Sequence, residues 1–206
     1  MPPVVKNMLI INTIMLFSTM VTGDFLYEKL ALFYPASPFF KPYQFITHIF
    51  MHGSFVHLFF NMYALWVFGC ALEYVWGSKR FFLFYMATGI GAAAFHTFVL
   101  WLTSTSMPTY SQVYLDLLRT PTVGASGAIY GVLLGYGMLF PNNILQLLFP
   151  PIALRAKWFV VIFGLLELLL GITNKGGNVA HFAHLGGMIF AFILIRFWRK
   201  KNTMYF

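Results

Sequence analysis

Residues 124–135 read GASGAIYGVLLG, and this segment is the best starting point for interpreting the chain. It places Ser126 in a glycine-flanked position at the start of an apolar segment that is typical of a helix. Two other apolar segments carry polar side chains, namely residues 52–61, which read HGSFVHLFFN, and residues 183–187, which read AHLGG. Because polar side chains are costly inside a bilayer, each of them needs a functional or structural reason.

The composition indicates a membrane protein. The chain has 206 residues, of which 60% are hydrophobic and 9% charged, whereas soluble domains carry about 25% charged residues. Its length favours a single membrane domain over residues 1–206. The formal net charge of +8 does not indicate a nucleic-acid partner, because the basic residues cluster at the ends of apolar runs, where they act as topology signals.

Six apolar runs of about 15 to 22 residues are each near the length that crosses a hydrocarbon core. Runs this long and continuous favour helices over barrel strands, so we predict an all-α polytopic membrane protein with six transmembrane helices. The first run lacks a cleavable signal-peptide pattern and is expected to remain in the protein. The runs are approximately Val4–Thr22, Phe55–Trp76, Phe81–Leu102, Val123–Phe140, Trp158–Thr173 and Val179–Trp198.

The basic residues predict the orientation. With the N-terminus in the cytoplasm, most Lys and Arg residues fall on the cytoplasmic side, as the positive-inside rule requires, and both termini are cytoplasmic. The cytoplasmic set is Lys6, Lys79, Arg80, Arg155, Lys157, Arg196, Arg199, Lys200 and Lys201, and the outer set is Lys29, Lys41, Arg119 and Lys175. The connection Gly23–Met51 is rich in apolar residues and predicts an element lying in the outer interface. The connection Ser104–Thr122 is polar and is expected to be an outer loop.

Three polar residues are predicted to lie at one depth. Asn61, Ser126 and His184 stand at similar distances from the cytoplasmic ends of their helices, about 21–23 Å at 1.5 Å rise per residue. Small residues also mark faces on which the fourth and last helices can approach closely, as a contact between Ser126 and His184 requires. These are Gly127, Gly131 and Gly135 on the fourth helix and Ala180, Ala183, Gly187 and Ala191 on the last.

This set of residues can perform acyl transfer. A serine hydroxyl needs an adjacent base, and His184 is the natural one for Ser126. No aspartate lies in any apolar run, so we expect a Ser–His dyad and not a triad. His57 and Asn61 are four residues apart on one helix face, and with the Ser126 backbone N–H they could form an oxyanion hole.

Three motifs together resemble those of the rhomboid family of intramembrane serine proteases. They are G-x-S-G at Gly124–Gly127, A-H-x-x-G at Ala183–Gly187 and H-x-x-x-N from His57 to Asn61, and the resemblance extends over residues 42–198. It implies Ser126 as nucleophile, His184 as general base and acid, and His57 and Asn61 in the oxyanion hole. It also implies that Tyr130 stacks on the His184 ring. The supporting glycines are Gly124, Gly127 and Gly187.

The resemblance further implies a rhomboid-like bundle with an interfacial first loop and with the fifth helix as the substrate gate. Substrates would be single-span transmembrane proteins cut within the lipid bilayer near their outer ends, without a cofactor or metal. The compact six-helix form favours a prokaryotic plasma membrane. The chain departs from the family at Lys41–Gln44, where many members carry an acidic residue and an arginine, which puts the stability of this loop in question.

Several polar residues remain without a settled role. His48 and His52 are expected to tie the first loop to the second helix, with a metal site or participation in the cavity as the alternative. His181 is expected to line the cavity mouth. Glu167 has no partner that the sequence identifies and is either functional, protonated or paired within the bundle. His96 is unassigned.

Two other functions fit parts of the pattern. One is a non-catalytic rhomboid-like protein that binds membrane clients, although such a protein does not need both Ser126 and His184. The other is a metal or proton transporter that uses histidines as ligands or relays. Those histidines would be His48, His52, His57, His181 and His184.

Overall fold

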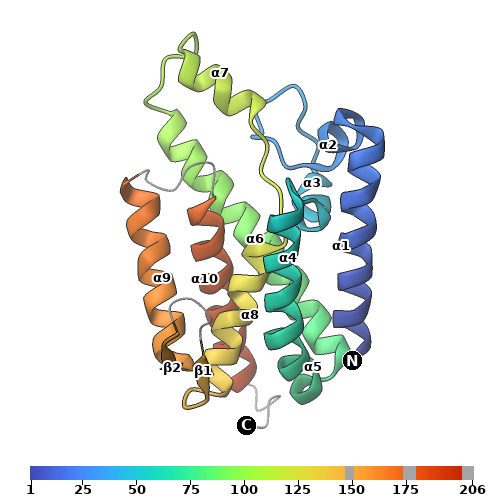
Figure 1. Ribbon diagram of the computed structural model, residues 1–206. Coiled ribbons are helices and arrows are strands. Elements are labelled where there is room, and N and C mark those ends of the chain that lie inside the picture. The colour runs from blue at the N-terminus through green and yellow to red at the C-terminus, as the bar shows by residue number, and fades with distance from the viewer. Residues whose placement is uncertain (147–150, 174–179, 201–206) are drawn as a thin grey trace.

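The computed structural model describes residues 1–146, 151–173 and 180–200, which fold mainly into helices (Figure 1). In chain order the elements are α1 (Pro3–Thr22), α2 (Asp24–Leu30), α3 (Gln44–Thr47), the 3₁₀ helix η1 (His48–Phe50), α4 (Phe55–Ala64), the π-helix η2 (Leu65–Gly69), α5 (Cys70–Trp76), α6 (Ser78–Ser104), α7 (Gln112–Arg119), α8 (Ser126–Leu139), β1 (Ile144–Gln146), β2 (Ala153–Arg155), α9 (Ala156–Thr173) and α10 (His181–Lys200).

Five helical segments in these ranges are long and apolar enough to cross a membrane. They are α1, the continuous segment Phe55–Trp76 formed by α4, η2 and α5, and the helices α6, α9 and α10. The remaining apolar helix, α8, has 14 residues. It is about 21 Å long, shorter than the roughly 30 Å of a hydrocarbon core. The chain is therefore a polytopic helical membrane protein, in which five of the six predicted runs form helices of spanning length.

The short helix α8 lies at the centre of the bundle. It packs against α6 and α10, and α9 contacts both α8 and α10. Figure 1 shows that α8 begins part-way down the bundle, below the end that carries α7. The predicted run Val123–Phe140 is only partly helical, because the chain enters the bundle in an extended segment and turns at Gly124, where φ is +126°. Ser126 is therefore the first residue of a helix that starts inside the protein.

Glycines allow close contacts around α8. A Cβ added to Gly187 of α10 would lie 1.9 Å from the Gly127 carbonyl oxygen, which confirms the predicted approach of α8 and α10. The rest of the predicted glycine stripe faces other helices. A Cβ on Gly131 would lie 2.7 Å from Thr88 of α6, and one on Gly135 would lie 3.1 Å from Leu72 of α5. The close approach of α8 to α10 is therefore made at Gly127, whereas Gly131 and Gly135 give space to α6 and α5.

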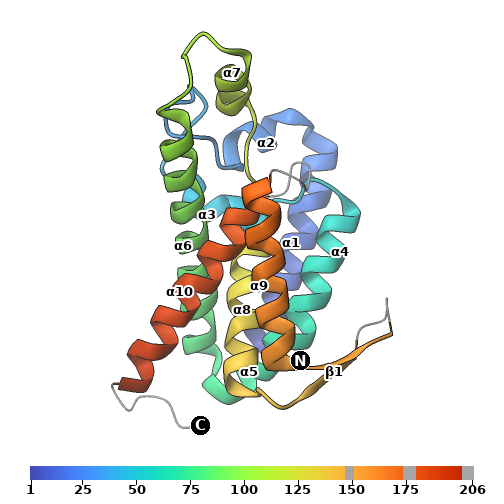
Figure 2. The same ribbon diagram turned by 90° about the vertical axis from the view of Figure 1, so that its left-hand side faces the viewer.

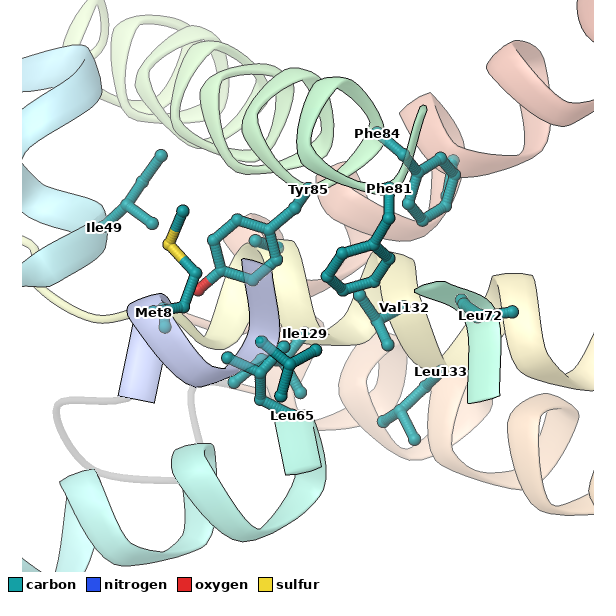
Figure 3. Close-up of a cluster of buried hydrophobic side chains, with 14 of the residues drawn as sticks. Met8, Ile49, Leu65, Leu72, Phe81, Phe84, Tyr85, Ile129, Val132 and Leu133 are labelled. Carbon is teal, nitrogen blue, oxygen red and sulfur yellow. The ribbon is translucent and has the colours of Figure 1, made fainter. Parts of the chain in front are cut away.

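Aromatic side chains from α6 fill the core beside α8 (Figure 3). Phe81, Phe84 and Tyr85 are fully buried, and they belong to one cluster with Leu65 and Val132. In lipid such helices associate mainly through close packing and hydrogen bonds, because the surrounding tails are themselves apolar. The core therefore fixes the position of α8 relative to α6.

A buried glutamate, which the sequence analysis did not single out, holds the start of α1. The Glu73 carboxylate of α5 accepts hydrogen bonds from the backbone N–H groups of Val4 at 2.9 Å and Val5 at 2.8 Å. The Ser78 hydroxyl donates to the same carboxylate at 2.7 Å. A helix N-terminus leaves unpaired N–H groups and favours negative charge, so Glu73 caps α1 and ties it to the turn between α5 and α6.

The first loop is organised around Gln44, which is 0% exposed. Its Oε1 accepts from the backbone N–H groups of Lys41 at 3.1 Å and Phe33 at 3.3 Å. Its Nε2 donates to the Phe39 carbonyl oxygen at 3.0 Å. Gln44 therefore holds several turns of the loop together.

The first loop is also joined to the segment that leads into α8. Leu32 and Thr122 form an isolated antiparallel bridge, with hydrogen bonds of 3.0 and 2.7 Å between their backbones. The Ser37 hydroxyl donates to the Leu118 carbonyl oxygen at 2.6 Å. These contacts therefore hold the segment that precedes Ser126 against the first loop.

Two elements differ from the sequence expectations. The predicted outer loop Ser104–Thr122 contains α7, which begins where the Ser111 hydroxyl accepts a hydrogen bond from the Tyr114 backbone N–H. The fold is all-helical as predicted except for a short hairpin between α8 and α9, where β1 and β2 pair in antiparallel fashion and extend beyond the helices (Figure 2). Strands of three residues are too short to show a periodic pattern in the sequence.

Candidate active site

Ser126 and His184 are in direct contact within the bundle. The Ser126 hydroxyl and His184 Nε2 share a hydrogen bond of 2.8 Å, an ordinary length for such a contact. Ser126 begins α8, and His184 lies one turn into α10. The contact that the sequence predicts is therefore present, and it depends on the close approach of Gly127 and Gly187.

Tyr130 holds the His184 ring from one side. It lies one turn after Ser126 on α8, and its ring stacks on the imidazole with centroids 4.2 Å apart and planes 8° from parallel. This is the stacking that the family resemblance implies. The Tyr130 hydroxyl donates to Glu167 Oε1 of α9, so the tyrosine links the histidine to a buried carboxylate.

Glu167 lies beside both histidines of α10. Its Oε2 is 2.6 Å from His181 Nδ1, which donates to it, and 3.0 Å from His184 Nδ1. Glu167 is 7% exposed. The sequence places no aspartate in an apolar run, and it does not indicate a partner for Glu167. The missing information was the rotation of α9, which is apolar on nearly all sides and so gives no sign of which face it buries.

His57 and Asn61 of α4 lie across from the serine. A Cβ on Gly124 would lie 2.9 Å from His57 Nε2, which places that ring against the turn just before Ser126. The Asn61 side-chain amide donates to His52 Nε2 at 3.0 Å, which fixes the amide orientation. The His52 and His57 rings meet edge to face, with centroids 5.1 Å apart. Both predicted oxyanion residues line the same cavity as Ser126.

A cavity of about 920 Å³ connects these groups. It is lined by His57 and Asn61 from α4, by Ser126 from α8 and by His184 from α10. Residues 120–124 form part of its wall. The cavity therefore brings polar side chains from three helices to one space inside the apolar bundle.

The histidines of the first loop are structural in their contacts. His48 Nδ1 donates to the Gln44 carbonyl oxygen at 2.9 Å. Burial lowers the pKa of His48 from 6.5 to about 4. Burial, together with the neighbouring His57, lowers the pKa of His52 from 6.5 to about 4. Both side chains are therefore neutral at pH 7, and His52 connects the loop to α4 through Asn61. His96 of α6 lines the cavity and remains without an assigned role.

Glu167, His181 and His184 are close enough to be considered as a metal site, since their ligand atoms lie within 4.8 Å of one another. Two ligands of a tetrahedral zinc ion with bonds of about 2.0–2.1 Å are roughly 3.3 Å apart. The contacts of Glu167 Oε2 with the two histidines, at 2.6 and 3.0 Å, are shorter. These separations are those of directly hydrogen-bonded or ion-paired groups.

Fold and site together define a class, namely a polytopic helical membrane protein that holds a serine and a histidine in contact at a cavity within its bundle. A family model described as the rhomboid domain matches residues 40–201. The chain belongs to the rhomboid family.

Three relatives illustrate the similarity. Rhomboid protein 1, mitochondrial, of Saccharomyces cerevisiae is 34% identical over 143 residues, which cover 69% of this chain and 38% of the yeast protein. Rhomboid protease GluP of Bacillus subtilis is 32% identical over 155 residues, covering 73% of this chain and 25% of GluP. Rhomboid protease AarA of Providencia stuartii is 28% identical over 143 residues, covering 68% of this chain and 50% of AarA. The chain thus spans half or less of each of these proteins, two of which are named as proteases.

Proposed function

We propose that this protein is an intramembrane serine endopeptidase that cleaves transmembrane proteins through an acyl-enzyme on Ser126. The observation that carries the proposal is the 2.8 Å hydrogen bond from the Ser126 hydroxyl to His184 Nε2 inside a membrane bundle. A hydroxyl becomes an effective nucleophile when an adjacent base can take its proton. Relatives named as rhomboid proteases support the same reaction class.

The reaction has two halves. Ser126 Oγ attacks the scissile carbonyl carbon while His184 Nε2 takes the hydroxyl proton, and the histidine then gives that proton to the leaving amine. Water next attacks the acyl-enzyme, with His184 taking a proton from the water and returning it to Ser126. Tyr130 keeps the imidazole ring in plane through the stacking contact at 4.2 Å.

The developing oxyanion has three candidate donors. They are the His57 ring, the Asn61 side-chain amide and the Ser126 backbone N–H at the start of α8. A helix N-terminus carries partial positive charge, which favours an anion there. The position of His57 against Gly124 and the hydrogen bond from Asn61 to His52 support a preorganised hole, and preorganised donors stabilise transition-state charge.

We further propose that all six apolar helices, α8 included, lie across the bilayer as one membrane domain over residues 1–206. Both termini would be cytoplasmic, in a prokaryotic plasma membrane. The distribution of basic residues supports this orientation, as does the start of α1 at the same end of the bundle as the end of α10 (Figure 1). Substrates would be single-span proteins whose helices open near their outer ends, because an intact helix hides its carbonyl groups.

The test is cleavage of a generic transmembrane substrate by purified protein in liposomes. Wild type and the matched control Ser106→Ala, at an exposed loop serine, are expected to cleave, whereas Ser126→Ala and His184→Ala are expected not to. Unfolding midpoints show that all four proteins are folded. If folded wild type is inert on several helix-destabilised substrates, the protease proposal fails and a client-binding protein becomes the better account.

A further inference from the structure

The inner side of His184 faces a carboxylate that no part of the reaction above requires. Beside a carboxylate, which accepts hydrogen bonds, the neutral ring carries its proton on Nδ1 and leaves Nε2 to accept from the Ser126 hydroxyl. Glu167 Oε2 lies 3.0 Å from that nitrogen. The Nδ1–H is not yet aligned as a linear hydrogen bond, and it has no other acceptor in the part of the chain that the structure describes. Catalytic hydrogen bonds are often loose before substrate binds.

The surroundings of Glu167 favour the ionised carboxylate. An ionised carboxylate within a membrane is tolerated when it is paired and hydrogen-bonded. Here the Tyr130 hydroxyl donates to Oε1, and His181 Nδ1 donates to Oε2 at 2.6 Å. Two donors therefore hold the carboxylate, and His184 Nδ1 lies 3.0 Å from it as a third nearby N–H group. This supply of donors is what an anion requires.

We propose that Glu167 is a positioning residue for His184, so that Ser126, His184 and Glu167 act as a Ser–His–Glu triad. This inference rests on the proposed protease function. When His184 takes the serine proton, it becomes an imidazolium, and the carboxylate 3.0 Å away stabilises that cation without itself becoming protonated. Glu167 also fixes the tautomer in which Nε2 is free to accept. Tyr130 joins the two, since it stacks on the ring and donates to the carboxylate.

A purely structural reading assigns Glu167 to His181, whose Nδ1 is closer, at 2.6 Å. In that reading the pair only fastens α9 to α10, and removing either partner has the same effect. If Glu167 acts through His184, removing Glu167 and removing His181 have different effects on catalysis. His184 contacts Ser126 Oγ, whereas His181 only shares the carboxylate oxygen with His184.

The pH dependence of catalysis distinguishes these readings. The ionisable groups that face His184 are Glu167 from α9, His181 from α10, Tyr130 from α8, His57 from α4 and His96 from α6. Only Glu167 supplies a negative charge among these. Its removal makes the imidazolium less stable, so the acidic limb of the pH–rate profile moves to lower pH. If Glu167 only fastens α9 to α10, its removal does not shift the acidic limb of the pH–rate profile.

The experiment compares wild type with Glu167→Gln, Glu167→Asp and His181→Gln in the liposome assay. For Glu167→Gln, which keeps shape but removes charge, we expect kcat to fall by about 10²- to 10⁴-fold with KM little changed. The acidic limb should move down by about one pH unit or more. Glu167→Asp should recover much of kcat, and His181→Gln should lose no more than about tenfold with an unchanged limb.

A second measurement uses wild type alone. After Ser126 is modified by a fluorophosphonate, an imidazolium bound to a carboxylate should give a far-downfield proton resonance that is absent from His184→Ala. This readout does not require Glu167→Gln to fold. Absence of the resonance in labelled wild type would contradict the triad.

Other outcomes would also overturn the inference. One is a Glu167→Gln variant with wild-type kinetics. Another is an equal loss of kcat in Glu167→Gln and His181→Gln with the acidic limb of the pH–rate profile unchanged. A third is loss of wild-type activity on adding EDTA, which would assign the cluster to a metal. Wild type that neither cleaves nor labels would instead mean that the proposed function itself is wrong.

Discussion

Gly187 of α10 sits directly against Gly127 of α8, so closely that a Cβ at position 187 would lie 1.9 Å from the Gly127 carbonyl oxygen. The two glycines adjoin the helix turns that carry Ser126 and His184, whose contact measures 2.8 Å. The separation of the two backbones at this point sets the separation of the two reactive side chains.

Gly187→Ala is therefore expected to push α10 away from α8 and lengthen the contact between Ser126 and His184. A misplacement of about 1 Å lowers turnover by about 10²-fold, and we expect a loss at least that large. The assay is the rate of fluorophosphonate labelling alongside substrate cleavage. Gly164→Ala on α9 is the matched control, because its Cβ would meet only the flexible end of Met188, at 3.2 Å. Equal activity of the two variants would contradict the argument.

Gln44→Ala should destabilise the first loop. It leaves the buried Phe33 N–H group and the partly buried Lys41 N–H group and Phe39 carbonyl oxygen without their partner. Each unsatisfied buried group costs about 1–3 kcal/mol, so we expect a loss of at least about 2 kcal/mol in unfolding free energy. Thermal unfolding in detergent measures it, with Gln112→Ala on the exposed face of α7 as the control. A midpoint equal to that of the control would show that the loop does not depend on Gln44.

Glu73→Gln should weaken the start of α1. The variant removes the negative charge that faces the Val4 and Val5 N–H groups and leaves one of them without a carboxylate partner. We expect a loss of about 1–2 kcal/mol in unfolding free energy. The control is Glu28→Gln, at an exposed position on α2, which also removes one negative charge. It should leave the unfolding free energy almost unchanged. Faster amide exchange confined to the first turn of α1 would locate the effect, whereas unchanged exchange there would argue against the cap.

Stability should fall as the pH is lowered through the range in which unfolded histidine titrates. The pKa of His52 is lowered from 6.5 to about 4 by burial in the folded protein, and that of His48 likewise. Between these values the unfolded chain binds protons that the folded chain does not, so the stabilisation is complete above about pH 6.5 and is lost progressively toward about pH 4. Unfolding midpoints across this range measure it.

His52→Gln provides the matched variant for this pH dependence. The glutamine retains an oxygen that can accept from Asn61 and removes one titrating group. Its midpoint should fall less steeply with decreasing pH than that of wild type. Equal slopes for the two proteins would mean that His52 is not buried as a neutral side chain.

Much of this arrangement could be predicted from the sequence, and the exceptions have physical causes. The polar residues Ser126, His184 and Asn61 stand out because they interrupt apolar runs, and counting the helical rise places them at one depth. Glu167 also stands out, but α9 is apolar on nearly every face, so the sequence does not indicate that this carboxylate turns toward His184. The hydrogen bonds of Gln44 join turns of a loop, and such turns have no periodic hydrophobic pattern from which they could be predicted.

The central claim is that Ser126 is a nucleophile activated by His184. The most direct measurement is mass spectrometry of wild type and His184→Ala after reaction with a fluorophosphonate. The account predicts a single covalent adduct on Ser126 in wild type and none in His184→Ala. An unlabelled but folded wild type, or equal labelling of Ser126 in both proteins, would contradict it.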